Sequence, residues 1–308
     1  MRRRRSVLGL LGLAAAAAAG VPILAQAGPG AIAPDLRADP PEAVGQPEQY
    51  TSGLMGGERL IVRFDGFVTN VGAGPLEISG NPQTTGSNGV QQRARTAGSA
   101  PGVLWGQTHQ IVSRPNLQVK YETADGHNHY HLMRVMRYSL WTADRRAEAA
   151  PGQKVGFCLY DIEVAPQPRP TPDPQVYSEA ATEFCDQGNP NTTSLVMGTG
   201  KGWRDVYDRG LAFQWVDVSD TPPGRYVVAA DADPEDVVWE GGGSAEGSAR
   251  AFASTEVVVP GWVAQPVSVE RTGQAQAIPL SSAKFGAQPD SQRRYRIVSG
   301  PADGTLNV

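Results

Sequence analysis

The sequence predicts an all-β protein, an antiparallel β-sandwich with long loops. Short β-rich runs recur along the chain, whereas amphipathic helical periodicity is hard to find after the first 27 residues. Gly, Pro, Asn and Asp punctuate the runs, as expected of turns between antiparallel strands. The predicted strands cover residues 60–68, 74–78, 118–121, 129–141, 154–161, 212–218, 224–230 and 253–259.

The segments between these strands divide the chain. Residues 80–102 and 165–175 are rich in Pro, Gly, Ser and Thr and are predicted loops, and the glycine-rich stretch 241–247 is a predicted flexible insert. Residues 28–260 are therefore assigned to one β-sandwich domain. Residues 261–308 end in a P-x-x-G-T-L turn that resembles a bacterial Ig-like or cadherin-like repeat, so they are predicted to be a partial, truncated module of that kind.

The N-terminus has the features of an export signal. Four arginines at positions 2–5 precede an apolar stretch over residues 7–19, and Ala25-Gln26-Ala27 is a small-residue cleavage site. We predict a signal peptide over residues 1–27, secretion, and no stable membrane insertion after cleavage. Arg4-Arg5 also fits a twin-arginine signal, and an uncleaved membrane anchor is the weaker alternative.

Charge argues against one class of partner. The formal net charge is −4, with 27 basic and 31 acidic residues. The segment 1–27 holds four arginines and no acid, so the remainder has 23 basic and 31 acidic residues, a balance of −8. This acidity argues against nucleic acid as a partner and mildly favours cationic ones.

The two cysteines, Cys158 and Cys185, belong to a chain predicted to be exported, where oxidation is the default. A disulfide between them would stabilise the fold by about 3 kcal/mol. Thiol metal ligands are the alternative. The absence of a C-x-x-C spacing favours the disulfide.

The most informative cluster is Asp125-Gly-His-Asn-His-Tyr-His131, which holds three of the chain's four histidines. Alternate residues of a strand point to the same face, so His127, His129 and His131 are predicted to converge. Three imidazoles suit a transition metal, copper and zinc above all. An exposed His-rich tract that binds metal only weakly is the alternative.

Further motifs follow this cluster in a recognisable order. They are K-V-G-F-C-L-Y-D at 154–161, G-W-R-D-V-Y at 202–207 and F-Q-W-V-D-V-S-D at 213–220 followed by P-P-G-R-Y at 222–226, with P-D-L at 34–36, V-R-F at 62–64 and N-V-G at 70–72 earlier in the chain. Together these segments resemble the catalytic domain of the lysyl oxidase family over roughly residues 33–259.

This resemblance implies a secreted bacterial copper amine oxidase with a lysine tyrosylquinone cofactor made from the protein's own side chains. His127, His129 and His131 match the copper ligands, Lys154 and Tyr207 match the cofactor residues, and Asp205 is the expected proton acceptor. The implied reaction converts primary amines to aldehydes with O2 and releases H2O2 and NH3. Peptidyl lysine is one alternative substrate.

The chain departs from the family at two places. Thr123-Ala124-Asp125-Gly126 stands where the family often has Trp and an extra His, and Asp125 is expected on the histidine face, where a carboxylate would join or tune the site. The family's acidic calcium segment is reduced to Asp233-Pro234 and Glu240, so calcium at Asp35 and Glu240 stays an open alternative.

Two other functions compete with the amine oxidase. One is a secreted, non-catalytic β-sandwich that keeps a metal site. The other is a metalloenzyme in which Asp125 and two histidines form a facial site for iron or zinc. The sequence decides neither which amine is used nor the oligomeric state.

Overall fold

A computed structural model describes residues 29–51, 57–98, 109–112, 114–124, 126–241, 250–264 and 282–284. The predicted signal peptide, Asp125 and most of the predicted C-terminal module lie outside these residues. Within them the prediction of an all-β protein is confirmed, because the strands pair antiparallel throughout. None of the described helices is long and apolar enough to cross a membrane.

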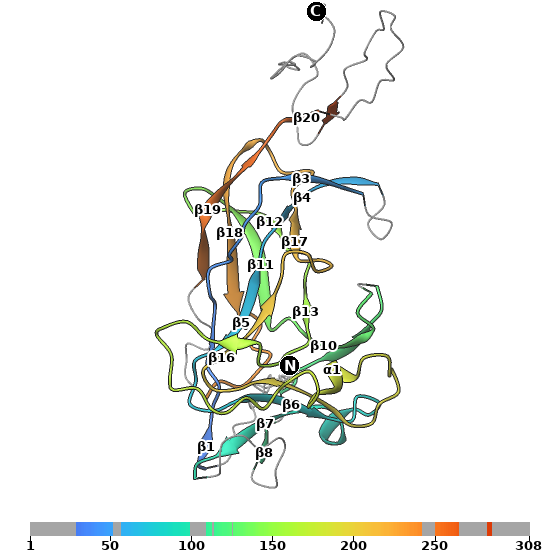
Figure 1. Ribbon diagram of the computed structural model, residues 1–308, viewed down its shortest axis with the longest axis vertical. Coiled ribbons are helices and arrows are strands. Elements are labelled where there is room, and N and C mark those ends of the chain that lie inside the picture. Colours follow the sequence, from blue (N-terminus) through green and yellow to red (C-terminus); the bar gives the residue numbers. More distant parts are fainter. Residues whose placement is uncertain are drawn as a thin grey trace, which may run out of the picture.

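Long strands form the upper part of the molecule (Figure 1). One sheet runs along the long axis and contains, in spatial order, β12 (Glu148–Pro151), β11 (Met136–Thr142), β18 (Gly224–Ala232) and β19 (Ala251–Val259). A second sheet contains β17 (Trp215–Asp217), β4 (Glu58–Arg63) and β3 (Glu48–Thr51). A third sheet contains β14 (Glu163–Val164), β16 (Trp203–Tyr207), β5 (Gly66–Asn70) and β2 (Leu36–Arg37).

The lower end holds a five-stranded sheet of β1 (Ala31–Ile32), β7 (Gln91–Thr96), β6 (Leu76–Gly80), β15 (Leu195–Thr199) and β8 (His109–Val112). Beside it lie β13 (Gly156–Phe157), β10 (His129–Met133) and β9 (Val119–Glu122). The remaining elements are the short helices η1 (Gly86–Asn88) and α1 (Glu183–Asp186) and the hairpin β20 (Trp262–Ala264) and β21 (Ser282–Lys284).

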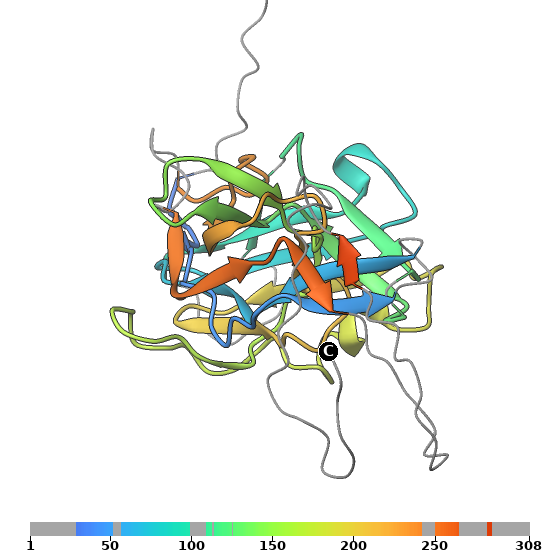
Figure 2. The ribbon, with the colours of Figure 1, turned by 90° about the horizontal axis from the view of Figure 1, so that it is seen from above.

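The layers meet over an apolar core. Phe64, the residue after β4, packs against Tyr138 of β11 with ring centroids 5.0 Å apart, and both side chains are buried. Gln46, just before β3, hydrogen-bonds the backbone of β19, which Figure 2 shows from above as the orange strand beside the blue ones. The core therefore joins strands from the first and last parts of the domain.

Several predicted boundaries are wrong. The run 60–68 is two strands of different sheets, β4 and β5, because the chain turns at Asp65, which bridges to Glu42. The run 129–141 also breaks, at Arg134, whose φ is +66°. Only Gly156 and Phe157 of the run 154–161 are in a strand.

The prediction of a loop over residues 80–102 is wrong in its second half, where β7 lies. This strand is rich in Gln and Arg, which reads as a loop composition, yet most of its residues are buried. It pairs with β8 on one side and with β6 and β1 on the other. Gln92 is buried and exchanges hydrogen bonds with the backbone of Trp239, so its polar side chain is satisfied inside the fold.

Candidate metal and cofactor site

The three clustered histidines converge. His129 and His131 lie in β10 and are 3% exposed each, while His127 precedes the strand and is partly exposed. The expectation that all three occupy one strand is therefore corrected for His127. Asn128, with φ of +54°, turns the backbone between them, and one ring nitrogen of each histidine still lies within 4.8 Å of the others.

This donor set fits a metal ion. The Nε2 atoms of His129 and His131 are 2.9 Å apart, a separation compatible with two imidazoles bound to one ion at about 2.0–2.1 Å. Burial, the nearby Lys154 ammonium and the neighbouring imidazoles lower the pKa of His131 to about 2. The ring is neutral at physiological pH, as a ligand must be. Among the described residues, these three histidines are the one group of three or more His, Cys, Asp or Glu side chains close enough together to hold a metal ion.

Lys154 is buried, although a lysine after Gly152 and Gln153 would ordinarily lie in water. The backbone before it is fixed, since Gly152 N–H donates to Tyr138 O and Gln153 N–H donates to Trp215 O. Its Nζ lies 5.0 Å from the centroid of the Tyr207 ring and 5.5 Å from that of Phe157. The two residues expected to form the cofactor therefore lie side by side.

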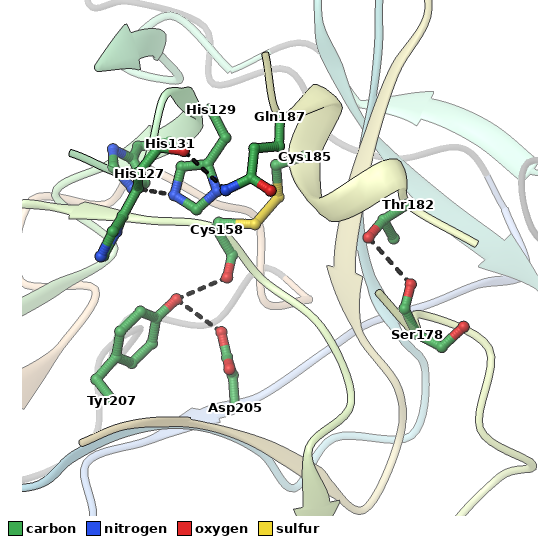
Figure 3. Close-up of a disulfide and its surroundings, with 10 residues drawn as sticks. All are labelled: His127, His129, His131, Cys158, Ser178, Thr182, Cys185, Gln187, Asp205 and Tyr207. Atoms are coloured by element: carbon green, nitrogen blue, oxygen red, sulfur yellow. Dashed lines mark hydrogen bonds between the residues drawn. A yellow bond between two sulfur atoms is a disulfide. The ribbon is translucent and has the colours of Figure 1, made fainter. Parts of the chain in front are cut away.

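Tyr207 and Asp205 are alternate residues of β16 and share one face of the strand. Both are buried, and the Tyr207 hydroxyl lies 2.6 Å from Asp205 Oδ2 and 2.8 Å from the carbonyl oxygen of Cys158 (Figure 3). The edge of Phe157 meets the Tyr207 ring at 90°, with centroids 5.0 Å apart. The phenol is therefore held in one orientation.

The protonation of this pair follows from burial. Burial raises the pKa of the Asp205 carboxyl well above its usual value, and burial with the adjacent Asp205 raises that of Tyr207. One phenol proton cannot serve two acceptors equally well. The Tyr207 hydroxyl donates to Asp205 Oδ2, the nearer acceptor, and the carbonyl oxygen of Cys158 is the second acceptor within reach. Asp205 can therefore hold a proton beside the Tyr207 ring.

A disulfide joins the two halves of the site, as predicted. Cys158, whose carbonyl accepts the Tyr207 hydroxyl, is bonded to Cys185 of α1 with a Cα–Cα distance of 5.9 Å. Figure 3 shows the bond between the histidines and the Tyr207–Asp205 pair. The disulfide thus links the segment beside the histidines to the backbone that orients Tyr207.

The α1 segment is a left-handed turn, which the sequence did not predict. Its four residues, Glu183–Asp186, have φ between +47° and +57°, a conformation that costs L-residues roughly 1–2 kcal/mol each. Contacts with the histidine segment hold it: Phe184 stacks on His129 with centroids 5.3 Å apart, and Gln187 Nε2 donates to His127 O at 2.9 Å. The turn covers His129.

A pocket of about 190 Å³ opens beside the site. Its residues come from β9, β10, β13 and the loops before β13 and β17, and include Glu122, His131, Met133, Lys154, Val155 and Phe213. Because His131 and Lys154 both line it, a small molecule in the pocket can contact one of the clustered histidines and the buried lysine together.

Comparison with known proteins relates this part of the chain to a family. Residues 103–246 match the family model described as lysyl oxidase. Over this segment, just under half of its length, the chain is similar to the lysyl oxidase family. The matched segment contains all three histidines, Lys154, Asp205 and Tyr207, so the family match and the candidate site lie in the same part of the chain.

Curated relatives are distant and longer. Lysyl oxidase homolog 1 of Homo sapiens is 30% identical over 118 residues, which are 37% of this chain and 17% of that protein. Protein-lysine 6-oxidase of Sus scrofa is 27% identical over 139 residues, 44% of this chain and 47% of that protein. Lysyl oxidase homolog 2 of Rattus norvegicus is 34% identical over 110 residues, 36% of this chain and 12% of that protein. The match thus spans less than half the length of each.

Similarity to the lysyl oxidase family supports a function of the amine-oxidase type, and the histidine triad could hold a metal. The calcium prediction is untested. Glu240 Oε1 accepts the backbone N–H of Leu36, so this carboxylate lies near Asp35. Among the described residues, no third carboxylate or histidine joins them in a group that could hold a metal ion. Calcium at Asp35 and Glu240 stays a prediction, as does any role of Asp125.

The site also contains supporting residues that the sequence motifs did not indicate. Phe184 and Gln187 support the histidine segment, and Phe157 supports Tyr207. No local pattern marks these three, because their roles arise from contacts across the fold. The disulfide could be predicted, since the chain has only two cysteines.

Removing the disulfide is expected to loosen both sides of the site. In the Cys158→Ser/Cys185→Ser variant we expect the free energy of unfolding to fall by about 2–5 kcal/mol, because the open loop gains entropy in the unfolded state. Affinity for a metal ion at the histidine triad should fall as well, since Phe184 is no longer held on His129. Urea unfolding of the metal-free protein and copper titration measure the two effects. Glu179→Gln, an exposed change in the same segment, is the control. Unchanged stability and affinity would contradict this account.

Proposed function

We propose that this protein is a secreted copper amine oxidase that converts primary amines to aldehydes with a lysine tyrosylquinone formed from Lys154 and Tyr207. The observation that carries the proposal is the 5.0 Å approach of Lys154 Nζ to the Tyr207 ring, in the same buried site as the histidine triad. The overall reaction consumes the amine, O2 and water and yields the aldehyde, NH3 and H2O2.

His127, His129 and His131 would hold the copper. When bound, copper with dioxygen supplies the oxidation of a tyrosine ring, and the resulting quinone supplies the electron sink for amine oxidation. The protein's own groups do the rest. Phe157 and the Cys158 carbonyl orient the Tyr207 ring, and the buried backbone around Gly152 and Gln153 presents the Lys154 amine to it.

Proton transfer falls to Asp205. Its Oδ2 is 2.6 Å from the Tyr207 hydroxyl, within the range for direct transfer. Burial raises its pKa, so this carboxyl accepts and returns a proton more readily than an exposed aspartate. A carboxyl in this position is suited to take a proton from the ring during cofactor formation and from the substrate carbon during turnover.

Two features support the finer parts of the proposal. The disulfide is of the kind kept in oxidising compartments, which supports secretion. The names of the Sus scrofa and Homo sapiens relatives, protein-lysine 6-oxidase and lysyl oxidase homolog 1, support lysine side chains as one substrate class. No nucleic acid is proposed as a partner, given the acidic composition.

Loading the purified protein with copper(II) in air tests the proposal. We expect a visible quinone absorption band, trapping of the cofactor by phenylhydrazine, and release of peroxide with a primary amine. Loading under nitrogen should give metal binding without the band, because dioxygen is the oxidant. Peptide mapping that finds Lys154 and Tyr207 unlinked, with no peroxide, would overturn the proposal. Copper-dependent stability without turnover would then indicate a non-catalytic metal-binding module.

A further inference from the structure

Glu122 lines the same pocket as His131 and Lys154. In the β9–β10 pair, Glu122 lies opposite His129 and Lys120 lies opposite His131. Residues directly opposite in an antiparallel pair share a face, so these four side chains project to the same side. Diagonal neighbours such as Glu122 and His131 are then roughly 7–8 Å apart, and their Cβ atoms are somewhat closer.

The Glu122 carboxylate already binds an alkylammonium ion. Its Oε2 accepts from Lys120 Nζ at 2.8 Å, while its Oε1 accepts the backbone N–H groups of Thr123 and Ala124. The two backbone bonds fix the carboxylate in place. The Lys120 side chain is 58% exposed, so its ion pair is weak and can be displaced by another cation.

The pocket sets the size of the ligand. A 150 Å³ protein cavity is large enough for a six-carbon ring, so about 190 Å³ suits an unbranched chain of six or seven heavy atoms. Met133, Val155 and Phe213 give it apolar walls. Val155 is 52% exposed, which leaves an apolar rim that a flexible alkyl chain can cover.

We infer that Glu122 is a specificity-determining residue that selects primary amines carrying a second positive charge at the far end of a short alkyl chain. The reacting amine would lie at the Lys154 and His131 side of the pocket, and the second ammonium would replace that of Lys120 on Glu122. The inference rests on the proposed function for the identity of the reacting end, but the charge preference belongs to the pocket itself.

Equilibrium binding of 1,5-diaminopentane and 5-aminopentan-1-ol to the metal-free protein tests this inference. The two ligands have the same chain length and differ in one terminal group, an ammonium in the first and a hydroxyl in the second. At low ionic strength we expect the diamine to bind about fivefold more tightly, the upper range for an exposed ion pair. The preference should shrink in 0.5 M salt, because salt screens exposed charges.

Glu122→Gln should remove the preference and bring the two dissociation constants within about twofold. Glu58→Gln, an exposed carboxylate of β4 that does not line the pocket, should keep it. Equal binding of the two ligands by the wild-type protein, or a preference that survives Glu122→Gln, would overturn the inference.

Turnover by the copper-loaded protein separates this inference from the proposed function. If the diamine preference and its loss in Glu122→Gln are seen but no amine is oxidised, the oxidase proposal fails and the role of Glu122 stands. If both ligands are oxidised with equal kcat/KM and bind equally, the oxidase proposal stands and the role of Glu122 fails.

Discussion

Lys154→Arg is expected to give a folded, copper-binding protein with no cross-link and no measurable amine oxidation. Arginine keeps the positive charge beside the Tyr207 and Phe157 rings, so the buried cation–π contacts survive. Its guanidinium stays protonated and is a poor nucleophile, so it cannot form the bond that the lysine amine forms. The loss should therefore be chemical and not structural.

Three measurements check this result on protein aerated with copper. Peptide mapping should find the Lys154 and Tyr207 peptides joined in the wild type and separate in the variant. The quinone band and peroxide release should disappear together, while copper content stays the same. Lys201→Arg is the matched control, because Lys201 lies away from the site and its Nζ pairs with Asp173 at 2.8 Å. Wild-type peroxide production by Lys154→Arg would show that the cofactor is made elsewhere.

His129→Ala should lower copper affinity by at least about 100-fold. Loss of an outer contact to a metal ligand already costs about 10- to 100-fold, and His129 supplies a ligand nitrogen directly. It also carries the stacked Phe184, so its removal frees the left-handed turn that covers the metal side. The variant should bind copper weakly through His127 and His131 and form no cofactor.

Thermal unfolding offers a readout that does not depend on activity. A ligand at 100 times its dissociation constant stabilises the folded state by about 2.7 kcal/mol, so copper should raise the melting temperature of the wild type clearly. His129→Ala should lose that rise. His109→Ala, in β8 of another sheet, should retain it. If copper raised the melting temperature of His129→Ala as much as that of the wild type, the histidine triad would not be the copper-binding site.

Parts of the site could be predicted because their signals are local. Three histidines at alternate positions predict that their side chains lie close together. Asp205 and Tyr207 are two residues apart, so they share one face of any strand that contains them. Lys154 is different. Its sequence neighbours predict exposure, and only the resemblance of its motif to a family pointed to a chemical role.

The fold was predicted in type but not in its divisions. Polar strands such as β7 escape detection, because a buried Gln92 or Arg95 reads as loop composition until its partners are known. The turn at Arg134 also leaves no clear local mark, since a positive φ in a non-glycine residue is imposed by packing.

The sequence by itself predicted an all-β chain, a cluster of histidines suited to a metal, one disulfide and a similarity to the lysyl oxidase family. The tertiary structure alone decided that Lys154 is buried against Tyr207, that a left-handed turn covers His129, and that Glu122 lines the pocket beside them. The physical reason is the range of the interactions. Residue type and strand periodicity act between neighbours in sequence, whereas burial, ring contacts and pocket shape join residues that the fold brings together from distant parts of the chain.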